Sequence, residues 1–126
     1  MAIVNQVQKK IKMDQWDIVK FQLNMYCYLN KISISDLDLN CLSILAIVGE
    51  KTIEEFCELC MESGIFNNNK SIRQHIRNVL NKAEKKNLII KKGKSKKKIT
   101  LNIQNIQTTG NILLDYKVLC IESQES

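Results

Sequence analysis

Proline is absent from this chain of 126 residues, which also has only four glycines, one tryptophan and one histidine. No apolar run is long enough to span a membrane. The N-terminus lacks the apolar core of a signal peptide. We therefore expect a protein that is neither membrane-inserted nor secreted.

The residue patterns of common catalytic sites are missing as well. We find no Ser-His-Asp arrangement, no Gly-rich phosphate loop and no paired carboxylates in an apolar setting. The absence of these patterns from the sequence argues against an enzyme and against a bound cofactor. We therefore expect a binding or structural protein.

The chain has five cysteines, an odd number, and they are scattered within apolar patterns. Such usage indicates reduced, buried residues and not a disulfide framework. Cys57 and Cys60 form a CxxC pair, but a zinc site would need two further ligands, and the only histidine is His75. A redox pair would lie at a helix N-terminus after a strand. We therefore predict that both cysteines pack in the core. A metal site and a redox pair are the less favoured alternatives.

Positive charge is gathered in one part of the sequence. Residues 70–98 hold twelve Lys or Arg and one acid, a net charge of +11, whereas the remainder has a net charge of −5. A separated basic region is typical of proteins that bind polyanions. The alternative is a solvated lysine-rich turn without a partner.

A helix with a clear start signal is predicted from Thr52. Glu55 follows three residues later and completes a capping box. One face carries the apolar positions Ile53, Phe56, Cys57, Cys60, Met61 and Gly64. The other carries Glu54, Glu55, Glu58 and Glu62. We interpret this second face as solvated, with a docking strip for a basic partner as the alternative.

A second helix is predicted to start near Ser71, after a turn at the three asparagines 67–69. Gln74 stands at capping-box spacing from Ser71. The expected buried side consists of Ile72, Ile76, Val79, Leu80 and Ala83. The opposite side consists of Arg73, Gln74, Arg77, Asn78, Asn81 and Lys82. Arg suits guanine, Asn and Gln suit adenine, and Lys suits phosphate, so this side is a candidate for contact with nucleic acid. His75 is interpreted as solvated, with a phosphate or base contact as the alternative.

Two short apolar runs follow, at 88–90 and 99–103, and the sequence KKGKSKKK stands between them. Gly93 can turn the tip of a β-hairpin there. The lysines have no apolar neighbours in the sequence, so the tip is expected to face water or a polyanion.

This order of elements resembles the winged helix-turn-helix superfamily in the style of the MarR-like regulators. The resemblance covers about residues 36–103, and its most specific part is SIRQHIRNVLNKAEKKNLIIKKGKSKKKITL. It implies an α+β fold with a three-helix core and a basic β-hairpin wing. The second helix of the pair would enter the major groove and the wing would contact the DNA backbone or minor groove. The implied groove-facing residues are Ser71, Arg73, Gln74, Arg77, Asn78 and Asn81, with Lys82 beside them. The implied wing residues are Lys92, Lys94, Ser95, Lys96, Lys97 and Lys98.

The chain departs from that pattern in two ways. The helix before the second one is long, and the Arg or Asp often found in a regulator's wing is absent. Both departures bear on sequence-specific regulation more than on the fold.

The segments on either side of residues 36–103 are apolar and are treated as separate units. Residues 1–35 are predicted as an arm, strand or helix, followed by a helix over 14–29 that starts at Asp14, although alternation between 19 and 27 also fits a strand. A further helix is expected after Ser35 or Asp36, ending at Gly49. Residues 104–126 contain an alternating stretch at 111–121 that favours a strand over a dimerisation helix. Such a segment needs a partner, which is the N-terminal arm or another subunit.

The sequence indicates two alternative functions. The first is non-enzymatic binding of duplex DNA, as a transcriptional regulator, with self-association through 1–30 and 111–121. The second is a structural subunit of an assembly, because the sequence also resembles small winged-helix proteins of AT-rich tailed phages such as the crAss-like phages. The expected location is then the cytoplasm of a bacterial or phage-infected cell, or a virion in contact with other particle proteins.

Overall fold

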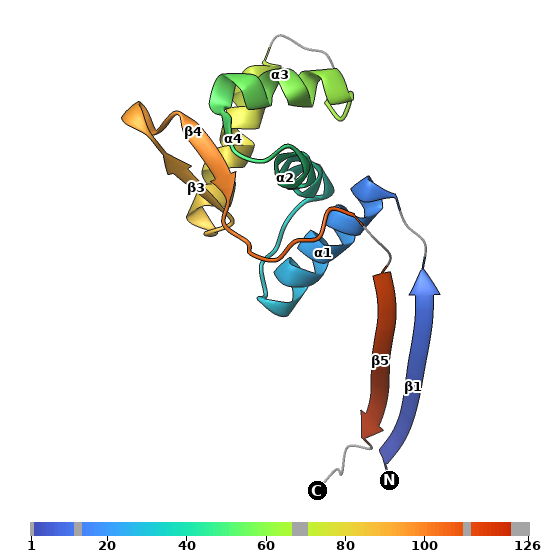
Figure 1. Ribbon diagram of the computed structural model, residues 1–126. Coiled ribbons are helices and arrows are strands. Elements are labelled where there is room, and N and C mark those ends of the chain that lie inside the picture. Colours follow the sequence, from blue (N-terminus) through green and yellow to red (C-terminus); the bar gives the residue numbers. More distant parts are fainter. Residues whose placement is uncertain (1, 12–13, 67–70, 110–111, 122–126) are drawn as a thin grey trace, which may run out of the picture.

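The central element of the protein is helix α2 (Asp36–Val48), whose sequence is apolar nearly all round. A helix of this kind is stable only when other elements cover it. The computed structural model describes residues 2–11, 14–66, 71–109 and 112–121, with side chains for 14–66 and 71–109. Figure 1 shows α2 within the body of the molecule, with α1 on one side and the α3–α4 pair on the other. Within these described residues, four helices and a small antiparallel sheet make the protein α+β, in a layout compatible with a winged helix.

The starts of α1, α2 and α3 follow from local capping signals, as the sequence predicts. Helix α1 (Gln15–Leu29) begins after Asp14, whose carboxylate accepts from the Asp17 N–H at 2.8 Å. Helix α2 is capped by Ser35 and ends at Gly49. Helix α3 (Ile53–Ser63) has the full Thr52–Glu55 capping box, and helix α4 (Ile72–Lys85) follows. The preference for a helix over a strand at 14–29 is therefore confirmed. The predicted asparagine turn at 67–69 lies outside the described residues.

The three-stranded sheet has the order β2-β4-β3 and is antiparallel. Strands β3 (Ile89–Lys92) and β4 (Lys98–Leu101) form the hairpin that the sequence predicts. Strand β2 (Lys51–Thr52) pairs with β4, which joins the start of α3 to the base of the hairpin. The Ile53 N–H also donates to the Lys97 carbonyl at 2.8 Å. The hairpin is therefore fixed relative to α3.

Helix α1 is packed into the same core as the other helices. Ile18, Val19, Leu23 and Cys27 are buried on its inner side, and Lys20 pairs with Asp36 at 2.9 Å. The segment after β4 returns across α1 as well. The Gln22 side chain donates to the Gln107 carbonyl at 2.7 Å and accepts from its N–H at 2.9 Å. Among the described residues, no helix is both long and apolar enough to cross a membrane.

The two ends of the chain form a β-ribbon of their own. Strand β1 (Ala2–Ile11) pairs antiparallel with β5 (Ile112–Ile121), from Ala2 opposite Ile121 to Ile11 opposite Ile112. Figure 1 shows this ribbon extending away from the helical body. The strand preferred for 111–121 is confirmed, and its partner within the chain is the N-terminal arm.

The C-terminus of α1 offers a stability test. It ends in a Schellman motif, because the Ile32 N–H donates to the Cys27 carbonyl at 2.8 Å and the Lys31 N–H donates to the Tyr28 carbonyl at 3.2 Å. Lys31 therefore has φ of 57°, a left-handed conformation that favours glycine. Lys31→Gly is expected to raise the free energy of unfolding by about 0.5–1 kcal/mol, since relief of the left-handed strain exceeds the loss of chain entropy.

Urea unfolding monitored by circular dichroism measures this change. A matched control is Asn87→Gly at the equivalent position of α4, where φ is 60°. Asparagine tolerates the left-handed region better than lysine, so the gain there is expected to be smaller. Equal gains at the two sites would contradict the explanation.

Candidate nucleic-acid interface

Helix α4 separates its residues into a buried and a solvated side, as predicted. The buried side consists of Ile72, Ile76, Val79, Leu80 and Ala83. The predicted contact residues Gln74, Arg77, Asn78, Asn81 and Lys82 are exposed, and Arg73 is half-buried. The structure therefore brings all six onto one helix surface. Several of them, however, have partners within the protein.

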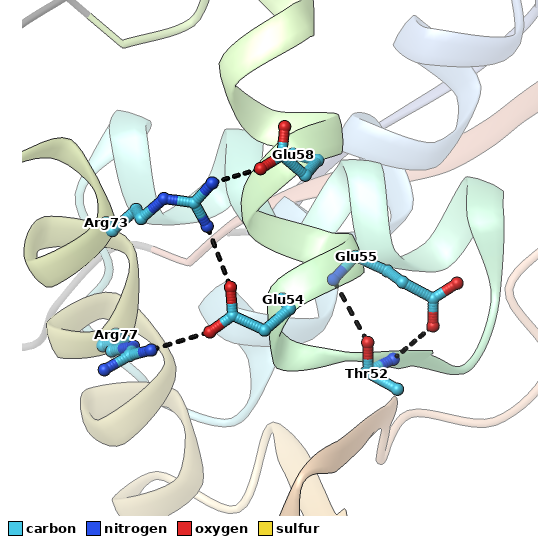
Figure 2. Close-up of polar contacts among 6 residues, drawn as sticks. All are labelled: Thr52, Glu54, Glu55, Glu58, Arg73 and Arg77. Atoms are coloured by element: carbon cyan, nitrogen blue, oxygen red, sulfur yellow. Dashed lines mark hydrogen bonds and ion pairs between the residues drawn. The ribbon is translucent and has the colours of Figure 1, made fainter.

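The two arginines of α4 are paired with glutamates of α3, as Figure 2 shows. Arg73 Nη1 lies 3.0 Å from Glu54 Oε2, and Arg73 Nη2 contacts Glu58 Oε1. Arg77 Nη2 lies 2.8 Å from Glu54 Oε1. We call these four residues the α3–α4 ion-pair cluster. The interpretation of this α3 face as solvated is thus incomplete, because two of its glutamates bind the chain's own arginines.

Hydrogen bonds shift two pKa values around this cluster. The bond to Glu58 raises the pKa of Arg73 above its usual value. Hydrogen bonding with the backbone and then the hydroxyl of Thr52 lowers the pKa of Glu55. Both groups therefore hold their charges at neutral pH. All members of the cluster are partly exposed, so water screens each pair and its contribution to stability is small.

The capping box predicted at the start of α4 does not form. Gln74 Nε2 donates to Asn78 Oδ1 at 3.0 Å, one helical turn along, and the Ser71 side chain makes no cap hydrogen bond. A partner four residues ahead on the same helix face competes with the helix N-terminus for the Gln74 amide. Gln74 and Asn78 therefore present a joined pair of amides at the surface.

Lys82 has a partner in the core helix. Its Nζ lies 3.0 Å from Asp38 Oδ2, and the Asp38 side chain is only 10% exposed. Lys82 thus neutralises a buried carboxylate in addition to being a candidate phosphate ligand.

Lys82→Ala is expected to lower the free energy of unfolding by about 1–2 kcal/mol, because it leaves the Asp38 carboxylate buried without its cation. Urea unfolding measures the loss. Adding Asp38→Asn to this variant removes the buried charge and should recover part of the stability. If Lys82→Ala alone has the stability of the wild-type protein, the pair has no structural role.

The tip of the β3–β4 hairpin lies at the left of Figure 1, and its lysines are exposed. Gly93 has φ of 87° and leads into a short 3₁₀ turn, Lys94–Lys96. Lys92 pairs with Glu50 at 2.6 Å, and Lys91 lies 3.6 Å from Glu84. Within the described part of the chain, no carboxylate pairs with Lys94, Lys96, Lys97 or Lys98, and these lysines and Ser95 are exposed. We call these four lysines the tip lysines.

An open cavity of about 740 Å³ lies between α4 and the hairpin. Its lining consists of Thr52, Ile53, Glu54, Gln74, Arg77, Leu80, Asn81, Lys91 and Lys97. Asn81 Oδ1 accepts a hydrogen bond from Lys91 there. Polar groups of α4 and a tip lysine thus face the same space. Glu54 is its one acidic member, a feature that the sequence pattern does not reveal.

The remaining candidates from the sequence are the CxxC cysteines and His75. Cys57 and Cys60 are fully buried, which confirms core packing, and burial raises the pKa of the Cys57 thiol. A hydrogen bond with Cys60 raises the pKa of the Cys41 thiol. His75 is exposed and meets the Phe66 ring edge-on, with centroids 5.3 Å apart.

The arrangement can therefore bind anions at the tip lysines and present amide groups from α4. Arg73 and Arg77 are present on the same surface but are already bound to carboxylates. Comparison with protein-family models, curated proteins and solved structures finds no match to this chain.

Proposed function

We propose that this protein binds duplex DNA, without catalysis, through a winged-helix unit formed by residues 36–103. The observation that carries the proposal is a hairpin of exposed tip lysines, of which Lys97 lines the same cavity as the polar side of α4. The four tip lysines have no carboxylate partner among the described residues, and one of them, Lys97, lines the cavity together with residues of α4. Such a surface suits duplex DNA. Contacts of cations with its phosphates supply much of the affinity, and contacts with base edges supply the sequence preference.

The tip lysines are unpaired among the described residues, whereas the arginines of α4 are paired with glutamates. This difference predicts how much each group contributes to the affinity for DNA. The tip lysines would supply most of the affinity, because they have no ion pair to break. Gln74, Asn78 and Asn81 would meet base edges or phosphates from α4. Arg73 and Arg77 would contribute less, because phosphate has to displace Glu54 first. We therefore propose that the protein binds DNA with modest sequence preference. Its proposed location is a bacterial or phage-infected cell, or a virion.

Filter binding of random and genomic duplex DNA across a range of salt concentrations tests this function. Counterion release predicts that log K falls linearly with log salt, with a slope of about −3 to −4 if the four tip lysines each contact a phosphate. Retention that does not depend on salt, or no retention at low salt, would exclude the proposal.

A second candidate function is that of a structural subunit, and the β1–β5 ribbon favours it. A two-stranded ribbon alone is at most marginally stable in water, and no further described strand pairs with either of its outer edges. On α1, Met25, Tyr28 and Leu29 are exposed at helical spacing. Both features suit self-association through residues 1–30 and 111–121, or contact with other particle proteins. Light scattering after size exclusion separates the cases, because a dimer suits a regulator and a large ring suits an assembly.

A further inference from the structure

The α3–α4 ion-pair cluster opposes the proposed binding, because its glutamates occupy the two arginines of α4. Glu54 stands between the two arginines and uses both of its oxygens, one for each. Figure 2 shows the carboxylate at the centre of this arrangement. Two glutamates and two arginines together carry no net charge. The first turns of α4 therefore present a neutral surface in the most basic part of the chain.

The two arginines differ in how firmly they are held. Arg73 has both terminal nitrogens engaged, one by Glu54 and one by Glu58. Among the described residues, Arg77 has a single ion-pair partner, Glu54, which it contacts through Nη2. Loss of the Glu54 charge would thus leave Arg77 without an ion pair among the described residues, while Arg73 would keep its bond to Glu58. Arg77 also lines the cavity beside the hairpin, where the proposed DNA backbone would lie.

Glu54 has a second effect on an anionic ligand. It lines the same cavity as Arg77 and Lys97, and its side chain is 66% exposed. A phosphate that enters would meet a like charge there, in addition to an arginine that is already occupied. Exposed ion pairs of this kind are weak, so a polyanion can displace the carboxylate, but with reduced affinity.

We propose that Glu54 is an intramolecular competitor that limits the affinity of this protein for DNA by occupying Arg77. This inference rests on the proposed function. It makes Glu54 the residue that sets how many cations of α4 are available to the ligand. A change that neutralises Glu54 therefore adds a phosphate contact without adding a basic residue.

Glu54→Gln tests the proposal in the same filter-binding assay with random duplex DNA. One further phosphate contact corresponds to a salt slope steeper by about 0.9 and to about fivefold tighter binding at about 0.15 M salt. A control with the same change in net charge is Asp17→Asn, at an exposed site on α1. Its effect should stay below about twofold, because its charge lies away from the cavity.

The Arg77→Gln background identifies the route of the effect. If Glu54 acts mainly by occupying Arg77, then Glu54→Gln should tighten binding much less once Arg77 is replaced, because only the like-charge repulsion is then relieved. A gain of the same size in that background would show general repulsion and overturn the proposal. So would weaker binding by Glu54→Gln alone, because that result would mean that Glu54 positions the arginines for DNA.

The outcomes also separate this inference from the function beneath it. If wild-type protein retains DNA with the expected salt dependence but Glu54→Gln equals Asp17→Asn, only the competitor role fails. If neither wild-type protein nor Glu54→Gln retains duplex DNA at low salt, both fail. Circular dichroism melts of each variant confirm that differences in retention do not arise from unfolding.

Discussion

Replacing Lys96, Lys97 and Lys98 together by alanine is expected to weaken binding of duplex DNA about 100-fold at about 0.15 M salt. The loss should be the same for every sequence, because lysine–phosphate contacts carry no base information. The salt slope should become shallower by about three, since each lost phosphate contact contributes about 0.9. Filter binding at several salt concentrations gives both quantities from one set of titrations.

The fold should survive this triple change. The side chains of all three lysines are exposed, and no carboxylate among the described residues pairs with them. Surface substitutions of this kind usually alter stability by less than about 0.5 kcal/mol. We therefore expect the triple variant to have the thermal melt of the wild-type protein while its affinity for DNA falls.

A single-site comparison controls for net charge. Lys97→Ala and Lys31→Ala each remove one exposed lysine, the first beside the cavity and the second at the end of α1. Lys97→Ala should weaken binding about fivefold and Lys31→Ala less than about twofold. Equal effects would mean that net charge, and not the hairpin, attracts DNA.

Short-range signals account for the parts of the fold that the sequence predicts correctly. The Thr52–Glu55 capping box, the Ser35 cap and the Asp14 cap each depend on residues three positions apart. The turn at Gly93 depends on one residue and its neighbours. In each case the physical cause lies within one turn of chain, so a local pattern is sufficient.

Features that depend on distant segments were not predictable in this way. Glu54 meets Arg77 across 23 residues, and the contact exists only because α3 and α4 pack at a particular angle. Strand β2 has two residues and is a strand only because β4 lies beside it. Alternation at 111–121 predicts a strand but does not choose between β1 and another subunit as its partner. The missing capping box at Ser71 is different, because the Gln74–Asn78 bond that forms in its place is also local, and the spacing of Ser71 and Gln74 alone does not show which of the two bonds forms.

Leu23→Ala is expected to lower the free energy of unfolding by about 3 kcal/mol. Leu23 is fully buried on α1, in the same core as Leu42 of α2 and Ile99 of β4. Replacement by alanine removes apolar contacts and leaves a cavity that the neighbouring helices fill only in part, which costs about 2–5 kcal/mol for a buried leucine. Urea unfolding followed by far-ultraviolet circular dichroism measures the loss.

The same variant tests whether α1 and the winged-helix unit unfold together. Because the core is continuous from α1 to the hairpin, loss of Leu23 should shift one cooperative transition that includes α4 and, with it, DNA retention. Leu29→Ala is the matched control on the same helix, since that side chain is 70% exposed and should change stability by less than about 0.5 kcal/mol. A separate early transition for α1, with α4 and DNA retention at their wild-type midpoints, would instead mean that residues 1–35 fold as an independent unit. In that case Gln22 and its bonds to Gln107 would hold two units together, and the ribbon with α1 could exchange between copies of the chain without disturbing the DNA-binding surface.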